Sequence, residues 1–165
     1  MVKDRPQIPS EKYSKGISVS LVTIKRNSRD SLNPAVKTGN YLNNILAWIE
    51  ASKTGAEDAI MMNPWGQLTE ATTSNLFFVM NGRLLTPEKE CGILSGITRE
   101  KIIQLANENG IVLKEGVWPG EELLKADEIF LSGTVKNIMP VSILDNRSVG
   151  NGKPLSLIHI SEPTR

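Results

Sequence analysis

The spacing of apolar residues changes several times along the chain, between the two-residue period of a strand and the three-to-four-residue period of a helix. Residues 17–24 alternate β-branched and small side chains, which predicts a strand. Residues 40–53 repeat apolar side chains at helical spacing and end before Gly55, a residue suited to terminating a helix. Further strands are predicted at residues 59–62, 67–69, 75–80 and 83–86, the last two joined by the hairpin signal Asn81-Gly82.

The second half of the chain continues the same mixture of helix and strand. Residues 96–109 predict a helix that buries Ile102, Ile103, Leu105 and Ala106 and stops at Gly110. Pro140 lies inside the last predicted strand, so we expect that strand at a sheet edge or with a bulge. The remaining predicted elements are strand 111–114, a short helix near 121–126, strand 128–131, a Ser-Gly-Thr turn at 132–134 and strand 138–144.

Length and composition narrow the classes of protein. The 165 residues are 39% apolar and 22% charged, enough for one globular domain or part of one. The formal charge of +1 argues against binding to nucleic acid or to an anionic membrane, and a single cysteine and a single histidine argue against disulfides and metal sites. The sequence has no apolar run of roughly 20 residues, so we expect a cytoplasmic protein.

Two residues, Lys37 and Glu70, are candidate catalytic groups. Lys37 precedes the first predicted helix, where a backbone turn can present its amine to a pocket, although most lysines are simply solvated. A desolvated lysine there would lose affinity for its proton and become a nucleophile toward carbonyl groups. Glu70 precedes the small polar run Ala71-Thr-Thr-Ser-Asn75 and is either an exposed turn acid or a carboxylate that faces a ring nitrogen.

Two segments have the character of anion sites. Gly96-Ile97-Thr98-Arg99 opens a helix, whose free N–H groups attract anions such as phosphate. The turn Ser132-Gly133-Thr134 offers further amides and hydroxyls, to the same anion or to a substrate carboxylate. Each segment taken alone is equally consistent with an ordinary structural cap.

Five motifs make the chain similar to a known family of pyridoxal-phosphate enzymes, the class IV or fold type IV family. It includes branched-chain amino-acid aminotransferases, D-amino-acid aminotransferases and aminodeoxychorismate lyases, and the resemblance is closest to the first group. The resemblance extends over about residues 17–153. The motifs are Lys37-Thr-Gly-Asn-Tyr41, Leu68-Thr-Glu-Ala-Thr-Thr-Ser-Asn-Leu-Phe77, Leu94-Ser-Gly-Ile-Thr-Arg99, Ala126-Asp-Glu-Ile-Phe-Leu-Ser-Gly-Thr134 and Ile138-Met-Pro-Val141.

The resemblance implies a role for several residues around the cofactor pyridoxal 5'-phosphate. Lys37 matches the catalytic lysine that forms the Schiff base and moves the proton between substrate and cofactor. Glu70 matches the carboxylate that pairs with the pyridine nitrogen, and Tyr41 matches a tyrosine near the phenolic oxygen. These three residue types suit a reaction in which the cofactor acts as electron sink and the protein supplies an amine and a ring-nitrogen partner.

The remaining matched residues are implied to hold the rest of the cofactor and the substrate. Leu94 matches an apolar residue packed on the cofactor ring. Ile97 and Thr98 match donors to the phosphate, and Thr134 matches a further phosphate contact. The substrate carboxylate is implied to lie near Gly133, Thr134 and Val135.

The resemblance also implies the fold and the reaction. We expect an α+β (mixed α/β) fold: the larger C-terminal domain of a fold type IV enzyme, with a β-barrel-like core flanked by helices. The implied reaction transfers an amino group between an amino acid, with a branched-chain one preferred, and a 2-oxo acid. The implied assembly is a homodimer or a higher homo-oligomer. The alternatives are an aminodeoxychorismate lyase, a D-amino-acid aminotransferase, and a catalytically inactive fragment.

The two ends of the chain depart from the family pattern. Residues 1–16 are polar and are expected to be a connector from a missing smaller N-terminal domain, which in the family supplies a phosphate-binding arginine. Residues 17–154 are then the cofactor-binding domain, incomplete at its end. Residues 155–165 resemble a translated sequencing adapter and are expected to be a non-native tail, which includes His159. Cys91, in a loop before Leu94, is expected to be an incidental small residue and not a nucleophile.

Overall fold

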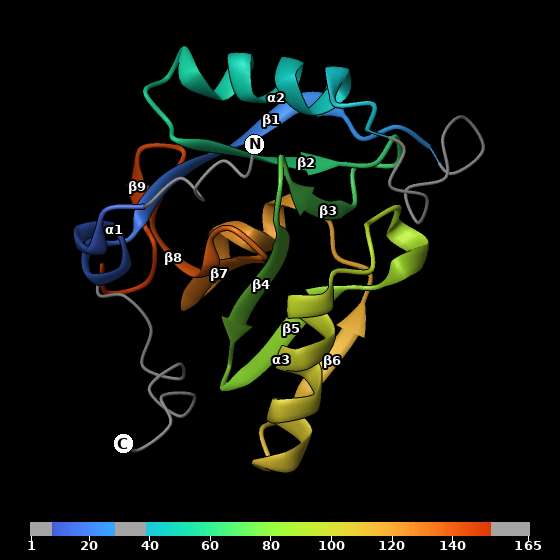
Figure 1. Ribbon diagram of the computed structural model, residues 1–165, viewed down its shortest axis with the longest axis vertical. Helices are drawn as coiled ribbons and strands as arrows, with labels where there is room; N and C mark the ends of the chain where they lie inside the picture. Colours follow the sequence, from blue (N-terminus) through green and yellow to red (C-terminus); the bar gives the residue numbers. More distant parts are fainter. Residues whose placement is uncertain (1–7, 29–38, 153–165) are drawn as a thin grey trace, which may run out of the picture.

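The computed structural model describes residues 8–28 and 39–152, which form one mixed sheet with helices packed on its outer faces (Figure 1). The helices are α1 (Ser10–Lys15), α2 (Leu42–Ser52) and α3 (Ile97–Glu108), with the 3-10 turns η1 (Lys89–Cys91) and η2 (Gly120–Lys125). The strands are β1 (Ile17–Lys25), β2 (Asp58–Met62), β3 (Leu68–Ala71), β4 (Asn75–Met80), β5 (Arg83–Pro87), β6 (Leu113–Gly116), β7 (Glu128–Gly133), β8 (Asn137–Leu144) and β9 (Arg147–Ser148).

Six of the strands close into a ring. Their order is β3-β2-β1-β8-β7-β4, and a pairing between Glu70 of β3 and Asn75 of β4 joins the two ends. The pair β5 and β6 extends the sheet beyond β4, and β9 pairs with β8. The predicted mixed α/β fold with a barrel-like core is therefore confirmed.

Each of the six ring strands contributes side chains to the main hydrophobic core. Burial of these side chains in one cluster is the main stabilising contribution to such a fold, at about 25 cal/mol per Å² of apolar surface. The buried side chains that the ring strands supply are Ile17, Val19, Ile60, Leu68, Ala71, Leu76, Phe78, Ile129, Leu131, Met139, Val141 and Leu144.

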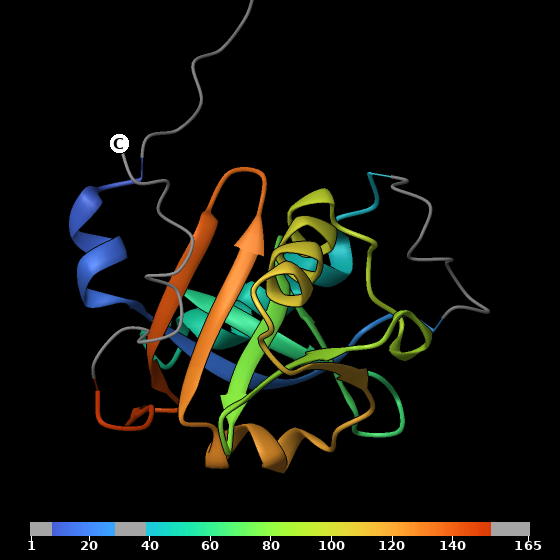
Figure 2. The same cartoon turned by 90° about the horizontal axis from the view of Figure 1, so that it is seen from below.

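Strand β4 is buried on both faces because it separates two clusters. Leu76 and Phe78 point to the main core, while Phe77 and Val79 point to a second cluster beneath α3. Phe77 stacks on Phe130 of β7 with a ring-centroid distance of 4.9 Å. Figure 2 shows α3 lying across β4 and β7 from the outside. The alternation of side chains along one strand therefore attaches the helix to the ring.

Helix α2 packs on β1 and β2 differently from what its sequence pattern suggests. The side that contacts the sheet is made of Ala47 and Ala51, which pack against Val22, Ala59 and Met61. The large apolar residues of the helix are exposed, with Leu42 at 63% and Ile45 at 51%. Small side chains on the inner side let the helix approach the sheet closely, so apolar spacing alone does not identify the buried face.

Several predicted boundaries move by a few residues in the structure. Residues 10–15, part of the expected connector, form helix α1. The turn after β7 comprises residues 134–136, because Ser132 and Gly133 still belong to the strand. Strand β8 is an interior strand and not an edge strand, and the register with β1 is irregular next to Pro140. Among the described residues, no helix has the length and apolar character needed to span a bilayer.

Candidate active site

A cavity of about 630 Å³ lies where several strand ends and turns meet. Its walls come from the residues after β1, the start of α2, strand β3 with the turn that follows, the loop before α3, and the end of β7 with its turn. The lining includes Arg26, Asn27, Asn40, Tyr41, Asn44, Glu70, Thr72, Thr73, Ser74, Asn75, Leu94, Gly96, Ile97, Thr98, Ser132, Gly133, Thr134, Val135 and Lys136. Segments far apart in sequence thus enclose one space.

Glu70 is the buried carboxylate of this cavity, and only 4% of its surface is exposed. Its Oε1 lies 2.8 Å from a guanidinium nitrogen of Arg26. Its Oε2 accepts the backbone N–H of Leu94 at 3.0 Å and the side-chain amide of Asn75 at 3.2 Å. Burial raises the pKa of the Glu70 carboxyl above its ordinary value, while Arg26 and the hydrogen bonds favour the charged form.

Arg26 is held in place from two sides. It follows directly after β1, and its backbone N–H donates to Met62 O at 2.8 Å, so strand β2 fixes the main chain. Its guanidinium donates to Asn44 Oδ1 of helix α2 at 2.9 Å and also meets Glu70. The cation is therefore part of the folded framework and keeps a compensating positive charge beside the buried acid.

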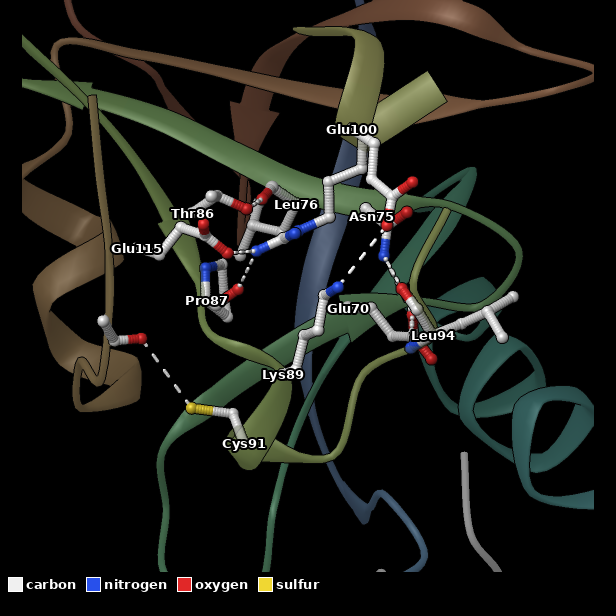
Figure 3. Close-up of polar contacts among 12 residues, drawn as sticks. Glu70, Asn75, Leu76, Thr86, Pro87, Lys89, Cys91, Leu94, Glu100 and Glu115 are labelled. Atoms are coloured by element: carbon white, nitrogen blue, oxygen red, sulfur yellow. Dashed lines mark hydrogen bonds and ion pairs between the residues drawn. The ribbon is translucent and has the colours of Figure 1, made fainter. Parts of the chain in front are cut away.

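Asn75 connects the acid to the loop before α3, as Figure 3 shows. Its amide donates both to Glu70 and to the carbonyl of Leu94, the latter at 2.8 Å. A Cβ atom at Gly96 would lie 2.2 Å from Asn75 Oδ1, so any other residue here would force the Asn75 amide out of its present position. The lack of a side chain at Gly96 lets the start of α3 approach β4 and the acid.

The start of α3 forms another wall of the cavity. Gly96, Ile97 and Thr98 line it, and Gly96 is the N-cap residue of the twelve-residue helix. Within residues 8–28 and 39–152, no side chain caps this end. The first N–H groups of the helix and the positive end of its dipole therefore favour an anion.

Two hydroxyl groups lie buried beside the cavity without a partner in the described part of the chain. They are Ser74 Oγ, in the turn between β3 and β4, and Ser132 Oγ, near the end of β7. A Cβ atom at Gly133 would lie 3.1 Å from Ser74 Oγ, so the two segments touch. Buried hydroxyls are normally paired, so these two are suited to bonding with a bound polar group.

The structure brings together the described residues that the sequence singled out. They are Tyr41, Glu70, Leu94, Ile97, Thr98, Gly133, Thr134 and Val135, and all of them line this cavity. Lys37 lies outside the described residues. Glu70 is buried, so the alternative of an exposed turn acid is wrong.

Sequence reasoning missed the residues that support the acid. Arg26, Asn44 and Asn75 make its contacts or hold its partner. Arg26 and Asn44 belong to none of the motifs, and Asn75 lies inside the motif around Glu70 but was given no role. Arg26 and Glu70 are 44 positions apart in the chain, so only the folded sheet places them together. One signal was present: an asparagine inside an otherwise apolar strand start, Asn75-Leu-Phe-Phe, needs a buried partner.

Cys91 lies in η1 and is buried. Burial raises the pKa of its thiol, and the nearby carboxylate of Glu88 adds to that effect. A thiol with a raised pKa is a poor nucleophile at neutral pH, which agrees with an incidental role. Among the described residues, no group of three or more histidine, cysteine, aspartate and glutamate side chains is placed to hold a metal ion.

Residues 2–144 match the family model of amino-transferase class IV. The chain belongs to this family. A relative from Methanocaldococcus jannaschii, provisionally named a branched-chain-amino-acid aminotransferase, is 43% identical over 136 residues, which make up 82% of this chain and 47% of that protein. The resemblance drawn from the motifs is therefore confirmed.

Solved structures of aminotransferases share the fold. The branched-chain amino acid aminotransferase of Escherichia coli matches with a TM-score of 0.88 and 37% identity, over 92% of this chain and 50% of that one. The branched-chain amino acid aminotransferase of Thermobaculum terrenum, solved in its PLP-form, matches with a TM-score of 0.86 and 35% identity, over 93% and 50%. The chain spans about half the length of these relatives.

Proposed function

We propose that the protein carrying this chain is a pyridoxal-phosphate-dependent aminotransferase that transfers the amino group of a branched-chain amino acid to a 2-oxo acid. The family and the names of the relatives support the reaction class. The observation that carries the proposal is the buried carboxylate of Glu70, which lines the cavity and has a cation and two N–H donors to hold it in place.

The residues of the cavity fit such a cofactor in size and in chemistry. A volume of about 630 Å³ is within the range of small-molecule sites. One wall carries a buried acid, and another carries an uncapped helix start. Ser74 and Ser132 add two buried hydroxyls that lack partners in the described segments. A group with a basic ring nitrogen and an anionic phosphate would complement these features.

When bound, pyridoxal phosphate supplies the electron sink that amino-acid side chains lack. Glu70 would hold a proton on the ring nitrogen, because a carboxylate in a buried site strongly favours an adjacent cation. Arg26 balances part of the charge of Glu70, which sets how strongly the acid attracts that proton. Leu94 would pack beside the ring, since its backbone N–H already fixes it against the acid.

The phosphate would be held by the start of α3. The N–H groups of Ile97 and Thr98 belong to the first turn of that helix, where anions are stabilised. Thr134, on the turn after β7, lines the same cavity and offers a hydroxyl. Gly133 and Val135 also line the cavity, and their backbone amides would orient the substrate carboxylate.

Lys37 is the proposed catalytic base. Its Nζ would hold the cofactor at the cofactor's carbonyl group, and the same amine, once the substrate amine has displaced it, would carry the proton at the substrate α-carbon. Tyr41, at the N-cap of α2, lines the cavity and would hydrogen bond to the cofactor's phenolic oxygen. Within the described residues, Lys136 is the one lysine that lines the cavity, and Asp58 holds it in an ion pair.

The assembly and the limits of the domain are parts of the same proposal. We propose a homodimer in the cytoplasm, a connector at residues 1–16, a cofactor domain at residues 17–154 and a non-native tail at residues 155–165. Deleting the tail should leave cofactor binding unchanged, as measured by absorbance titration. Sedimentation should give twice the mass of one chain.

The test uses the full-length protein, by which we mean this chain within a polypeptide of the length of its relatives. Addition of leucine, isoleucine or valine should convert the absorbance of the bound cofactor to that of its amine form, with release of the 2-oxo acid. Conversion of the cofactor by D-alanine but not by leucine, isoleucine or valine would assign a D-amino-acid aminotransferase in place of a branched-chain one. Release of pyruvate from aminodeoxychorismate without amino transfer would assign a lyase, and absence of any conversion would contradict the proposal.

A further inference from the structure

A second buried acid lies behind the cavity. Asp58, at the start of β2, is 1% exposed. Its Oδ1 accepts the hydroxyl of Thr72 at 2.6 Å and the backbone N–H of Ala59 at 2.8 Å. Its Oδ2 forms an ion pair with the ammonium group of Lys136. This one carboxylate therefore gathers donors from three segments.

The partners of Asp58 belong to the two turns that face each other at the cavity. Thr72 lies in the turn between β3 and β4, and Lys136 lies in turn 134–136 between β7 and β8. Both residues line the cavity, whereas Asp58 is absent from its lining among the described residues. Gly133, the last residue of β7 before turn 134–136, also lies against Thr73 and Ser74 of the other turn.

The Glu70 side of the cavity is held by other contacts. Arg26, Asn75 and the N–H of Leu94 fix that acid without any bond to Asp58 or Lys136. The turn at residues 134–136 has no comparable side-chain anchor among the described residues other than Lys136. Loss of the pair should therefore loosen this turn and leave the Glu70 side in place.

We propose that Asp58 and Lys136 form a positioning pair that holds turn 134–136 in place for binding the substrate carboxylate. The first part, the fixing of the turn, concerns this chain alone, and the second part rests on the proposed function. Lys136 acts through the turn that carries it and is not itself the carboxylate receptor, because its ammonium group is engaged by Asp58.

Hydrogen exchange tests the first part without cofactor or activity. Asp58→Asn keeps the shape of the side chain and an acceptor for Thr72 but removes the charge that Lys136 meets. Lys136→Met removes the cation. In the chain itself, both variants should raise amide exchange at residues 134–137 by about tenfold, the effect of losing roughly 1.4 kcal/mol. Unchanged exchange in both variants would overturn the proposal, whatever the activity of the protein.

Steady-state kinetics of the full-length holoenzyme test the second part. Both variants should raise KM for the amino acid by about tenfold and change kcat by less than about threefold, because the chemistry depends on other residues. Lys136→Arg keeps a cation and should restore most of the affinity. The matched control is Glu57→Gln, at the position before Asp58. It breaks the exposed ion pair between Glu57 and Lys12 and should leave KM unchanged.

The outcomes separate this proposal from the proposed function. A rise in KM for Lys136→Met but not for Asp58→Asn would make Lys136 a direct substrate contact and overturn the positioning role. An unchanged KM for the amino acid in both variants of an active enzyme would also overturn the positioning role. A protein without transaminase activity whose turn still loosens in both variants would refute the proposed function and support the fixing of the turn.

Discussion

Glu70 and Asp58 are two buried acids on adjacent strands, and they differ in what they face. Each accepts hydrogen bonds from neighbouring groups and meets one cation, Arg26 for Glu70 and Lys136 for Asp58. Glu70 lines the cavity, whereas Asp58 lies behind the turns that line it. The two sites thus have similar chemistry but different access to a ligand.

The difference shows why burial and charge alone do not identify a catalytic group. A buried carboxylate with a cation and donors is stable in both places, because each charge is compensated. Of these two acids, only Glu70 lines the cavity that we propose as the ligand site. We therefore expect substitutions at Glu70 to affect the chemistry, and substitutions at Asp58 to affect stability and the geometry of the binding turns.

The largest expected effect is on catalysis at Glu70. In the full-length protein, Glu70→Gln should lower kcat by about 100-fold or more, because a neutral amide does not stabilise a proton on the ring nitrogen. Steady-state kinetics with leucine measure this effect. Glu50→Gln makes the same chemical change at a glutamate that caps two amides of β1 and should leave kcat nearly unchanged. Equal losses of kcat in Glu70→Gln and Glu50→Gln would contradict a specific role of Glu70 in the chemistry.

The next effect is on stability at Asp58. Asp58→Ala leaves Lys136 and Thr72 without their partner, and we expect the free energy of unfolding to fall by about 3 kcal/mol. Glu57→Ala removes the neighbouring exposed acid and should cost less than about 1 kcal/mol. Urea denaturation of the chain gives both values. A cost at Asp58 as small as that at Glu57 would show that the buried pair contributes little.

A smaller effect is expected at the contact that supports Glu70 from the loop before α3. Gly96→Ala places a methyl group where Asn75 Oδ1 now lies, so the amide must move away from Glu70. We expect a loss of about 2 kcal/mol in stability and weaker cofactor binding, measured by urea denaturation and absorbance titration. The control Ser95→Ala changes the adjacent position without adding a side-chain atom there. Stability equal to that of Ser95→Ala would rule out the proposed steric constraint.

The smallest effect is the pH dependence that Glu70 adds to folding without cofactor. Because burial raises its pKa in the folded state, the folded protein holds the proton more tightly than the unfolded chain does. The stability that this group contributes is therefore complete below its ordinary pKa and is lost as the pH rises through the raised value. Relative to Glu70→Gln, the unfolding free energy of the parent chain should fall over that range. A rise in this relative unfolding free energy with pH would contradict a raised pKa of Glu70 in the folded state.

Local features of the sequence predicted most of the fold. The hairpin between β4 and β5 follows from Asn81-Gly82, because both residues adopt the positive φ angles that this turn needs. Strand and helix positions followed from periodicity in the same way. The closure of the ring through Glu70 and Asn75, and the burial of Ala47 and Ala51 in place of larger neighbours, depend on tertiary packing that no local pattern encodes.

The candidate site was predictable where short motifs carry it. The motifs around Glu70, Leu94 and Ile97 contribute to the wall of one cavity, because each lies at a strand end or a helix start. The supporting pairs were not predictable. Asp58 and Lys136 are separated by 78 positions, and an ordinary aspartate and lysine in sequence give no sign that the sheet will pair them.

Borohydride reduction of the full-length holoenzyme, followed by peptide mapping, identifies the lysine that carries the cofactor. Reduction fixes the cofactor to the amine that carries it. We expect the label on Lys37, with Lys136 unlabelled because Asp58 holds its ammonium group. A label on Lys136 or on any other lysine, or no label at all, would contradict the assignment of this cavity as a pyridoxal-phosphate site served by Lys37.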